Sequence, residues 1–327
     1  MRRNLIKFMN IFDLHADILF DFSNKNKLGI KTNIFKKYHL QKFKKGNIIG
    51  GIFVAWLNDE IPEEKEEEEM IFMINSSIKE LNNNLDIFNI LKNNSDINKI
   101  SSDKINIILG IEGLRAIKNN LNMLEVFYNL GFRHASLTWN EENSLATGAK
   151  GNKNRGLTSD GEKIIIKMNE LGMIIDVSHA NERTFWDIYN LSSSPIIASH
   201  SNVKALCNSP RNLSDNQIIA IAKSGGLIGI NAYKYFIKEN CENVYLSDLF
   251  NHLKYLVDLI GIDYVAFGFD FCEYLDNNHF DKTPIGLENT SKCQNFITFL
   301  YKQGYSKEMI EKVAYKNFIR FLKNNFK

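Results

Sequence analysis

Short apolar runs recur along the chain, and most of them are followed by a longer segment in which apolar residues have helical spacing. The runs carry few charges before their last residue, which is typical of parallel strands that are buried on both faces. Eight such runs are found, at residues 11–17, 48–56, 105–112, 133–139, 173–179, 195–200, 227–231 and 264–270. The helical patterns lie at residues 70–91, 121–130, 160–171, 182–191, 214–223 and 247–260. The acidic run at residues 63–69 is interpreted as the solvated first turns of a helix.

This alternation of strands and helices predicts an α/β fold. Eight strand and helix pairs without a Pro/Gly-rich linker favour one catalytic (β/α)8 barrel, the TIM-barrel architecture, over residues 1–327. A doubly wound open sheet is the structural alternative. In a barrel the loops that follow the strands gather at one mouth, so functional side chains should stand at the last positions of several different strands.

Acids and histidines stand at these predicted strand ends. In an extended strand, residues two apart point to the same face, so His15 and Asp17 can bind one cation. The alternative is that His15 is a hydrogen-bonded histidine and Asp17 the N-cap of the next helix. Asp13, one layer deeper, is interpreted as a buried polar support. The other strand ends contribute Glu112, His179, His200 and Asp270.

Imidazole nitrogens and carboxylate oxygens at an open site favour Zn²⁺, with Mn²⁺, Fe²⁺ and Co²⁺ as alternatives. Five ligands are more than one catalytic zinc needs, so the pattern predicts two ions bridged by Glu112. His15 and Asp17 would complete the ligands of one ion, and His179 and His200 those of the other. Two metal ions can deprotonate a shared water and polarise a carbonyl, which is the chemistry of hydrolysis. The alternative for each residue alone is a satisfied polar group of the core.

Composition narrows the range of partners and compartments. Forty Lys and Arg against 38 Asp and Glu leave a formal net charge of +2, and no dense basic block is present, so nucleic acid is not an expected partner. The opening residues 1–9 lack an unbroken apolar core, and no apolar run could span a bilayer, so neither a signal peptide nor a membrane anchor is expected. A reduced, cytoplasmic protein fits the four cysteines, which share no metal-binding spacing: Cys207, Cys241, Cys272 and Cys293.

Taken together, the motifs resemble the membrane dipeptidase family, which comprises renal dipeptidase and its bacterial relatives and is also called peptidase family M19. The resemblance covers nearly the whole chain. Its motifs are the HxD at residues 15–17, the GxEG around Glu112, the GLT at 156–158, the segment 171–179, the SHS around His200, Arg211-Asn212, the GFDF at 268–271, the GLEN at 286–289, and Asn317.

The resemblance implies a zinc-dependent dipeptidase of the amidohydrolase-like barrel type. Such an enzyme hydrolyses small dipeptides, including those with a C-terminal D-residue, by a metal-bridging hydroxide. Arg211 matches the arginine that pairs with the substrate carboxylate, a role suited to its planar fork. Asp270 matches the aspartate that takes a proton from the bridging water and passes it to the leaving amine, and its alternative role is to orient a metal-binding histidine. Members are commonly dimers, so a homodimer is an expected assembly.

The chain departs from the mammalian pattern at Trp139, where those enzymes have a histidine thought to face the oxyanion. An indole N–H can donate a hydrogen bond but carries no charge. Oxyanion stabilisation would then depend on a metal ion, Asn140 or Asn143, while Trp139 can equally form a wall against the substrate. Tyr233 aligns with a family aromatic near the substrate. Two other functions stay open, a binuclear metal amidohydrolase acting on another amide or a lactone, and a catalytically inactive barrel that binds peptides.

Overall fold

The computed structural model describes residues 8–240, 242–275 and 282–327. Residues 1–7, on which the signal-peptide interpretation partly depends, and Cys241 lie outside these described residues. Within them, no helix is both long and apolar enough to cross a membrane.

All eight predicted strands are present, and one short strand, β3, was not predicted. The strands are β1 (Ile11–Ala16), β2 (Ile48–Trp56), β3 (Phe88–Ile90), β4 (Ile105–Glu112), β5 (Phe132–Ser136), β6 (Ile174–Asp176), β7 (Ile196–Ile197), β8 (Ile228–Ile230) and β9 (Val265–Phe267). Except for β3, each overlaps its predicted run. The prediction of residues 133–139 was too long at its end, because β5 stops at Ser136 and Trp139 lies in the following loop.

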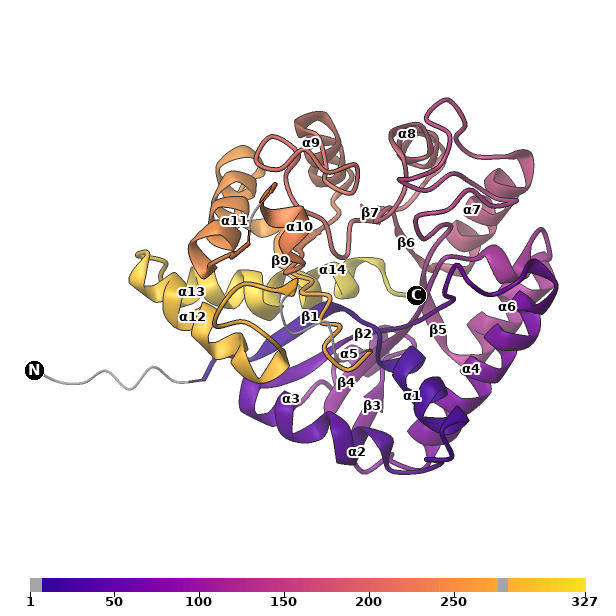
Figure 1. Cartoon of the computed structure of the whole chain (residues 1–327), viewed down its shortest axis with the longest axis horizontal. Coiled ribbons are helices and arrows are strands. Elements are labelled where there is room, and N and C mark those ends of the chain that lie inside the picture. Colours follow the sequence, from indigo (N-terminus) through magenta and orange to yellow (C-terminus); the bar gives the residue numbers. More distant parts are fainter. Residues whose placement is uncertain (1–7, 241, 276–281) are drawn as a thin grey trace, which may run out of the picture.

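The strands form a curled parallel sheet with helices around its outside (Figure 1). β1, β2, β4, β5, β6 and β7 are hydrogen-bonded neighbours in that order. β8 pairs in parallel with β9, and a bridge between Ala198 and Ile228 connects the end of β7 to β8. This arrangement confirms the predicted TIM barrel.

Every predicted helix is present, and only α4 differs from its predicted range by more than one residue at either end. The helices are α1 (Ile18–Lys27), α2 (Ile34–Tyr38), α3 (Leu40–Gly46), α4 (Glu66–Asn82), α5 (Asn94–Ile97), α6 (Leu121–Leu130), α7 (Ser159–Leu171), α8 (Glu182–Leu191), α9 (Asp215–Ser224), α10 (Lys234–Ile237), α11 (Leu246–Ile260), α12 (Cys293–Lys302), α13 (Lys307–Glu311) and α14 (Asn317–Asn325). The acidic run begins as a 3-10 turn and enters α4 at Glu66. α4 ends at Asn82 and not at residue 91, because the chain turns at Asn84 and then pairs as β3 with β4.

The barrel interior is filled by apolar side chains below the site. On β4, Ile108 shares the inward face with Glu112 and belongs to a buried cluster with Ile52 and Val54 of β2. α14 covers the end of the barrel opposite to Glu112, where the ring of Phe318 lies 5.2 Å from the ring of Phe12. The polar site therefore rests on a packed core and not on an open channel.

Asp13 links the first and last strands of the barrel. Its Oδ1 atom accepts hydrogen bonds from the backbone N–H of Phe269, at 2.9 Å, and of His15, at 3.4 Å. Burial raises the pKa of Asp13 to about 7, because the apolar surroundings favour the neutral acid. The ladder between β1 and β2 is irregular between Asp13 and Ala16, so the strict alternation assumed for this stretch does not hold.

Replacing Asp13 with Ala should lower the free energy of unfolding by about 1–3 kcal/mol, because the buried N–H of Phe269 would lose its acceptor. Asp13→Asn is the matched control, since the amide oxygen can accept the same bonds and carries no charge. Urea denaturation followed by circular dichroism, with chelator present so that metal binding does not contribute, measures both. Equal stability of Asp13→Ala and the parent protein would contradict this role.

Candidate metal centre and substrate cleft

Glu112 Oε1 is the point on which three predicted histidine ligands converge. It lies 2.9 Å from His179 Nε2, 3.3 Å from His200 Nε2 and 3.7 Å from His15 Nε2. All four side chains are buried, although they come from the ends of β1, β4 and β6 and from the segment after β7. The barrel thus brings together residues that are up to 185 positions apart in the sequence.

The two remaining acids approach the centre from the side of His15. His15 Nε2 lies 3.6 Å from Asp17 Oδ1 and 3.9 Å from Asp270 Oδ1. Asp17 occupies the N-cap position of α1, as the alternative interpretation expected, but its side chain makes no capping hydrogen bond. Its carboxylate is therefore directed to the cluster and not to the helix.

Hydrogen bonds on the far side of the rings fix the orientation of two histidines. Ser199 Oγ donates its single proton to Asp176, so it must accept from His200 Nδ1, at 2.8 Å. His179 Nδ1 lies 3.0 Å from the side-chain oxygen of Asn140 and donates to it. In both rings Nδ1 then carries the proton, and the lone pair of Nε2 is directed toward Glu112.

Asp176 anchors this support below the site. Its carboxylate accepts from His134 Nε2 at 3.0 Å and from the backbone N–H of Ser178 and Ser199, at 2.9 and 3.0 Å. Burial alone would raise the pKa of Asp176, but the hydrogen bond and charge of His134, with the hydrogen bond from Ser199, hold it well below its usual range. Asp176 is thus a buried carboxylate that stays ionised and holds Ser199 in place.

The charge states suit a cation-binding site. Burial lowers the pKa of both His179 and His200 well below the ordinary value, so both rings are neutral ligands. For His15, burial acts in the same direction, but the carboxylates of Glu112, Asp17 and Asp270 outweigh it and raise the pKa to about 10. The three carboxylates around His15 therefore favour a positive charge at its position.

Three of these side chains carry buried atoms without a hydrogen-bond partner among the described residues, namely His15 Nε2, Asp17 Oδ1 and Glu112 Oε1. Unpaired polar atoms at this depth are unfavourable and need a partner. Donor atoms of His15, Glu112 and His200, and of His15, Asp17 and Asp270, lie close enough to surround an ion. The residues present therefore fit a metal centre, and the atoms that lack protein partners are the atoms a metal would bind.

Backbone strain marks two of the predicted site residues. His179 has φ +70° and Asp270 has φ +58°, which is the left-handed region that residues other than glycine rarely adopt. Such conformations persist only where the surrounding structure enforces them, and they are concentrated at functional sites. His179 lies three residues after the end of β6 and Asp270 three residues after the end of β9, so both stand in loops that follow the strands.

Above the cluster lies a cleft of about 810 Å³, lined by the predicted substrate-binding residues Trp139, Asn140, Arg211 and Tyr233. Arg211 is 6% exposed, donates from Nη2 to the backbone oxygen of His200 at 3.2 Å, and has no partner for Nε within the described part of the chain. Burial lowers the pKa of Arg211 to about 10, so it stays cationic at neutral pH. The guanidinium can therefore receive an anion.

Three aromatic rings form one wall of the cleft. The ring of Trp56 stacks on Phe20 at 4.6 Å and on Trp139 at 5.3 Å. Only Trp139 was predicted. The sequence could have predicted that Trp56 lines the cleft, because it is the last residue of a predicted strand. Phe20 lies in a helix, where the sequence gives no such indication.

Sequence reasoning also missed Asn231, which orients Asp270. The side-chain amide of Asn231 donates to Asp270 Oδ2 at 3.0 Å, and its oxygen accepts from the backbone N–H of Tyr233. Asn231 ends the seventh predicted strand, so its position was a usable signal. Ser199 and Asp176 gave weaker signals, because serine and aspartate beside a strand end have many structural roles.

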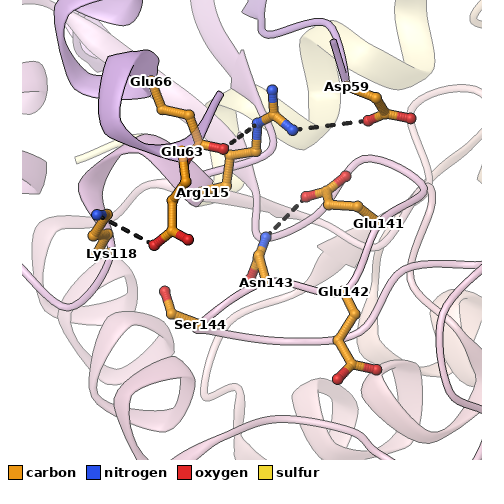
Figure 2. Close-up of a pocket in the computed structure, with 9 residues that line it drawn as sticks. All are labelled: Asp59, Glu63, Glu66, Arg115, Lys118, Glu141, Glu142, Asn143 and Ser144. Atoms are coloured by element: carbon orange, nitrogen blue, oxygen red, sulfur yellow. Dashed lines mark hydrogen bonds and ion pairs between the residues drawn. The ribbon is translucent and has the colours of Figure 1, made fainter. Parts of the chain in front are cut away.

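A separate acidic pocket is lined by residues of the loops after β2, β4 and β5 and by Glu63 and Glu66 (Figure 2). Asp59 and Glu141 of this pocket directly follow Asn58 and Asn140, which line the cleft. Arg115 Nε lies 3.3 Å from Glu66 and its Nη1 lies 3.8 Å from Asp59, while Lys118 pairs with Glu63 at 3.3 Å. Glu141 and Glu142 are among its lining residues, so acids outnumber bases. Asn143, predicted as an alternative for oxyanion stabilisation, lines this pocket and not the cleft, so the structure does not support that role.

Comparison with known sequences identifies one family. The model of the membrane dipeptidase family, peptidase family M19, matches residues 1–326. An uncharacterized protein of the pqqA 5' region of Klebsiella pneumoniae is 34% identical over 240 residues, which are 70% of this chain and 86% of that protein. Dipeptidase aclJ of Aspergillus oryzae is 33% identical over 225 residues, 68% of this chain. The chain spans about half the length of this and the other fungal relatives, 52% in the case of aclJ.

Solved structures share the fold at low sequence identity. A metallo peptidase from Rhodobacter sphaeroides, liganded with a phosphinate mimic of the dipeptide L-Ala-D-Ala, superposes with a TM-score of 0.88 at 23% identity, covering 98% of this chain and 100% of that one. The probable dipeptidase PvdM from Pseudomonas aeruginosa has a TM-score of 0.83 at 21% identity, covering 96% of this chain and 95% of that one.

Ser199→Ala should weaken divalent-metal affinity about 10- to 100-fold, because His200 would lose the acceptor that fixes its Nδ1 proton. Competition with a chromogenic chelator measures the affinity directly, without a substrate. Ser77→Ala is the matched control, since Ser77 is an equally buried serine that bonds only backbone oxygens, at Met73 and Leu19. Unchanged affinity in Ser199→Ala, or an equal loss in both variants, would contradict the positioning role.

Proposed function

The chain belongs to the membrane dipeptidase family, peptidase family M19, and we propose that it hydrolyses small dipeptides, including those that end in a D-residue, with two bound zinc ions. The D-residue is suggested by the L-Ala-D-Ala mimic bound to the Rhodobacter structure. The observation that carries the proposal is the convergence of three histidine Nε2 atoms on one carboxylate oxygen of Glu112, in a family of metallopeptidases.

In this proposal His15, Asp17 and Glu112 would hold one ion, and Glu112, His179 and His200 would hold the other. The neutral rings of His179 and His200 and the unpaired atoms of His15, Asp17 and Glu112 support this assignment. Bound zinc supplies Lewis acidity that activates a water and polarises the scissile carbonyl. Glu112 would be a ligand of both ions.

Arg211 binds the C-terminal carboxylate of the dipeptide. A buried guanidinium with an unpaired Nε is a strong carboxylate donor, because charge-assisted bonds gain strength where water is excluded. This contact orients the peptide so that its scissile bond lies over Glu112. It also explains why a free carboxylate beside the scissile bond would be required.

Asp270 moves the proton. Burial raises its pKa to about 6, close to neutrality, where a carboxyl group can both accept and release a proton. It takes a proton from the attacking water and gives it to the leaving amine as the C–N bond breaks. Asn231 fixes its Oδ2, so Oδ1, which faces His15, is the oxygen that carries the proton.

Three other predicted residues shape the substrate site. Trp139, supported by Trp56, forms an apolar wall, and Tyr233 lines the cleft on the side of Arg211. Asn140 accepts from His179 through its oxygen, so its amide nitrogen is the end that can donate to the developing oxyanion. This hydrogen bond would replace part of the role of the mammalian histidine.

Chelator treatment should abolish dipeptide hydrolysis, and added Zn²⁺ should restore it with about two ions bound per chain. The measurement combines metal content by mass spectrometry with turnover of a panel of L,L and L,D dipeptides. Metal-loaded protein that cleaves no member of the panel would overturn the proposed activity. Protein that binds no metal would instead favour the inactive barrel.

Arg211→Ala should lower kcat/KM for a dipeptide about 100-fold, because the substrate carboxylate would lose its charged partner. The same dipeptide with a C-terminal amide is the control substrate. The parent protein should prefer the free acid strongly, and the variant should treat acid and amide nearly alike. If the variant loses both activities equally, Arg211 does not read the carboxylate, and an amidohydrolase with another substrate becomes the better assignment.

A further inference from the structure

A second pocket, of about 610 Å³, lies directly beside the catalytic cleft. It is formed by the loops after β5, β6 and β7, and it shares Lys150, Pro210 and Arg211 with the cleft. We call it the lysine pocket, because Lys150, Lys153 and Lys204 line it together with Arg211. The two pockets are therefore neighbours, and the side chain of Arg211 lines both of them.

The lysine pocket carries uncompensated positive charge. Glu182 is the one acidic residue among those that line it. Within residues 8–240, 242–275 and 282–327, no ion pair involves Lys150, Lys153 or Lys204. The positive end of α8, which begins at Glu182, lies at the same rim. Of the charged side chains that line the pocket, all except Glu182 therefore stabilise a bound anion.

Buried polar groups in the wall also lack partners. Ser201 is 1% exposed and Arg211 6%, yet Ser201 Oγ and Arg211 Nε make no hydrogen bond to a described residue. Both can donate. Asn212 Oδ1 is also unpaired, while its amide nitrogen is occupied by the backbone oxygens of Cys207 and Phe236. With Arg211 Nε assigned to the carboxylate in the cleft, Ser201 Oγ and the three lysines that make no ion pair with a described residue match the acceptor oxygens of a second carboxylate.

We propose that the lysine pocket binds a second carboxylate, carried by the side chain of the substrate's C-terminal residue. This inference rests on the proposed function, because it uses Arg211 as the partner of the α-carboxylate. The two carboxylates of a C-terminal Asp or Glu are joined by a short chain. When one of them binds Arg211 from the cleft, the other is therefore directed past the same guanidinium toward the lysines. The preferred substrates are dipeptides that end in Asp or Glu.

The opposite charge of the neighbouring acidic pocket supports this orientation. Acids predominate in the pocket beside β2 and β4 (Figure 2), whereas bases predominate in the lysine pocket. A dipeptide has a cationic amino end, and an acidic C-terminal residue makes its other end doubly anionic. The field across the cleft therefore favours binding with the C-terminal residue toward the lysine pocket.

The experiment compares kcat/KM for Ala-Asp and Ala-Asn, in both L,L and L,D forms, using the metal-loaded full chain. Asn is the control residue because it has nearly the shape of Asp without the charge. We expect Ala-Asp to be preferred about tenfold, and the preference to shrink as ionic strength rises. Free Asp, as a product, should also inhibit more strongly than free Asn.

The double variant Lys153→Met/Lys204→Met removes charge from the lysine pocket without touching the cleft itself. It should lower kcat/KM for Ala-Asp about tenfold, to the level of Ala-Asn, and leave Ala-Asn within about twofold. Lys79→Met/Lys223→Met is the matched control, because both of its exposed lysines lie on outer helices and the change in net charge is the same.

Equal kcat/KM for Ala-Asp and Ala-Asn in the parent protein would overturn this inference and leave the dipeptidase proposal intact. An equal loss for both substrates in the lysine-pocket variant, or the same selective loss in the control variant, would also overturn it. Failure to cleave any dipeptide would overturn the dipeptidase proposal and this inference with it.

Discussion

The crowding of three imidazole nitrogens around one buried oxygen of Glu112 is the constraint on which the site depends. Acids and neutral imidazoles placed this close, away from water, are stable only if a cation or a proton balances the acids. Within the protein, His15 supplies that balance by taking up a proton, since its pKa is about 10. A divalent ion provides the same balance with more charge and satisfies the unpaired donor atoms as well, so the cluster is preorganised for metal.

Several contacts of the surrounding chain hold these side chains in this unfavourable arrangement. Ser199 is the key contact, because it connects Asp176 to His200. A Cβ atom at Gly229 or Gly268 would lie 1.9 or 1.8 Å from the backbone oxygen of Ser199, so only glycine lets the strands close around that segment. The strained backbone of His179 and Asp270 is maintained by the same rigid surroundings.

The barrel architecture and the residues that meet at Glu112 could be predicted from the sequence for a physical reason. Apolar runs that end in a charged or polar residue mark strands of a parallel barrel, whose ends meet at one mouth, and His15, Glu112 and His200 obey this rule. The end of α4 was predicted wrongly, because the apolar residues of the turn and the short strand after it have helical spacing by chance. Ser199, Asn231 and Phe20 were missed because their roles depend on which loops meet in space. Homodimer formation and a cytoplasmic location stay predictions.

Different parts of the barrel mouth would carry out the reaction and select the substrate: the residues around Glu112 and the loops that surround them. The groups that converge on Glu112 are held by strand ends and by a buried hydrogen-bond network, so a change in any one disturbs the others. The lysine and acidic pockets are built largely from loops. The lysine pocket meets the cleft at Lys150, Pro210 and Arg211, and the acidic pocket shares no lining residue with the cleft. On the proposed assignment, charge could therefore change in these loops without a change at the residues around Glu112, and the loops would set which dipeptide binds.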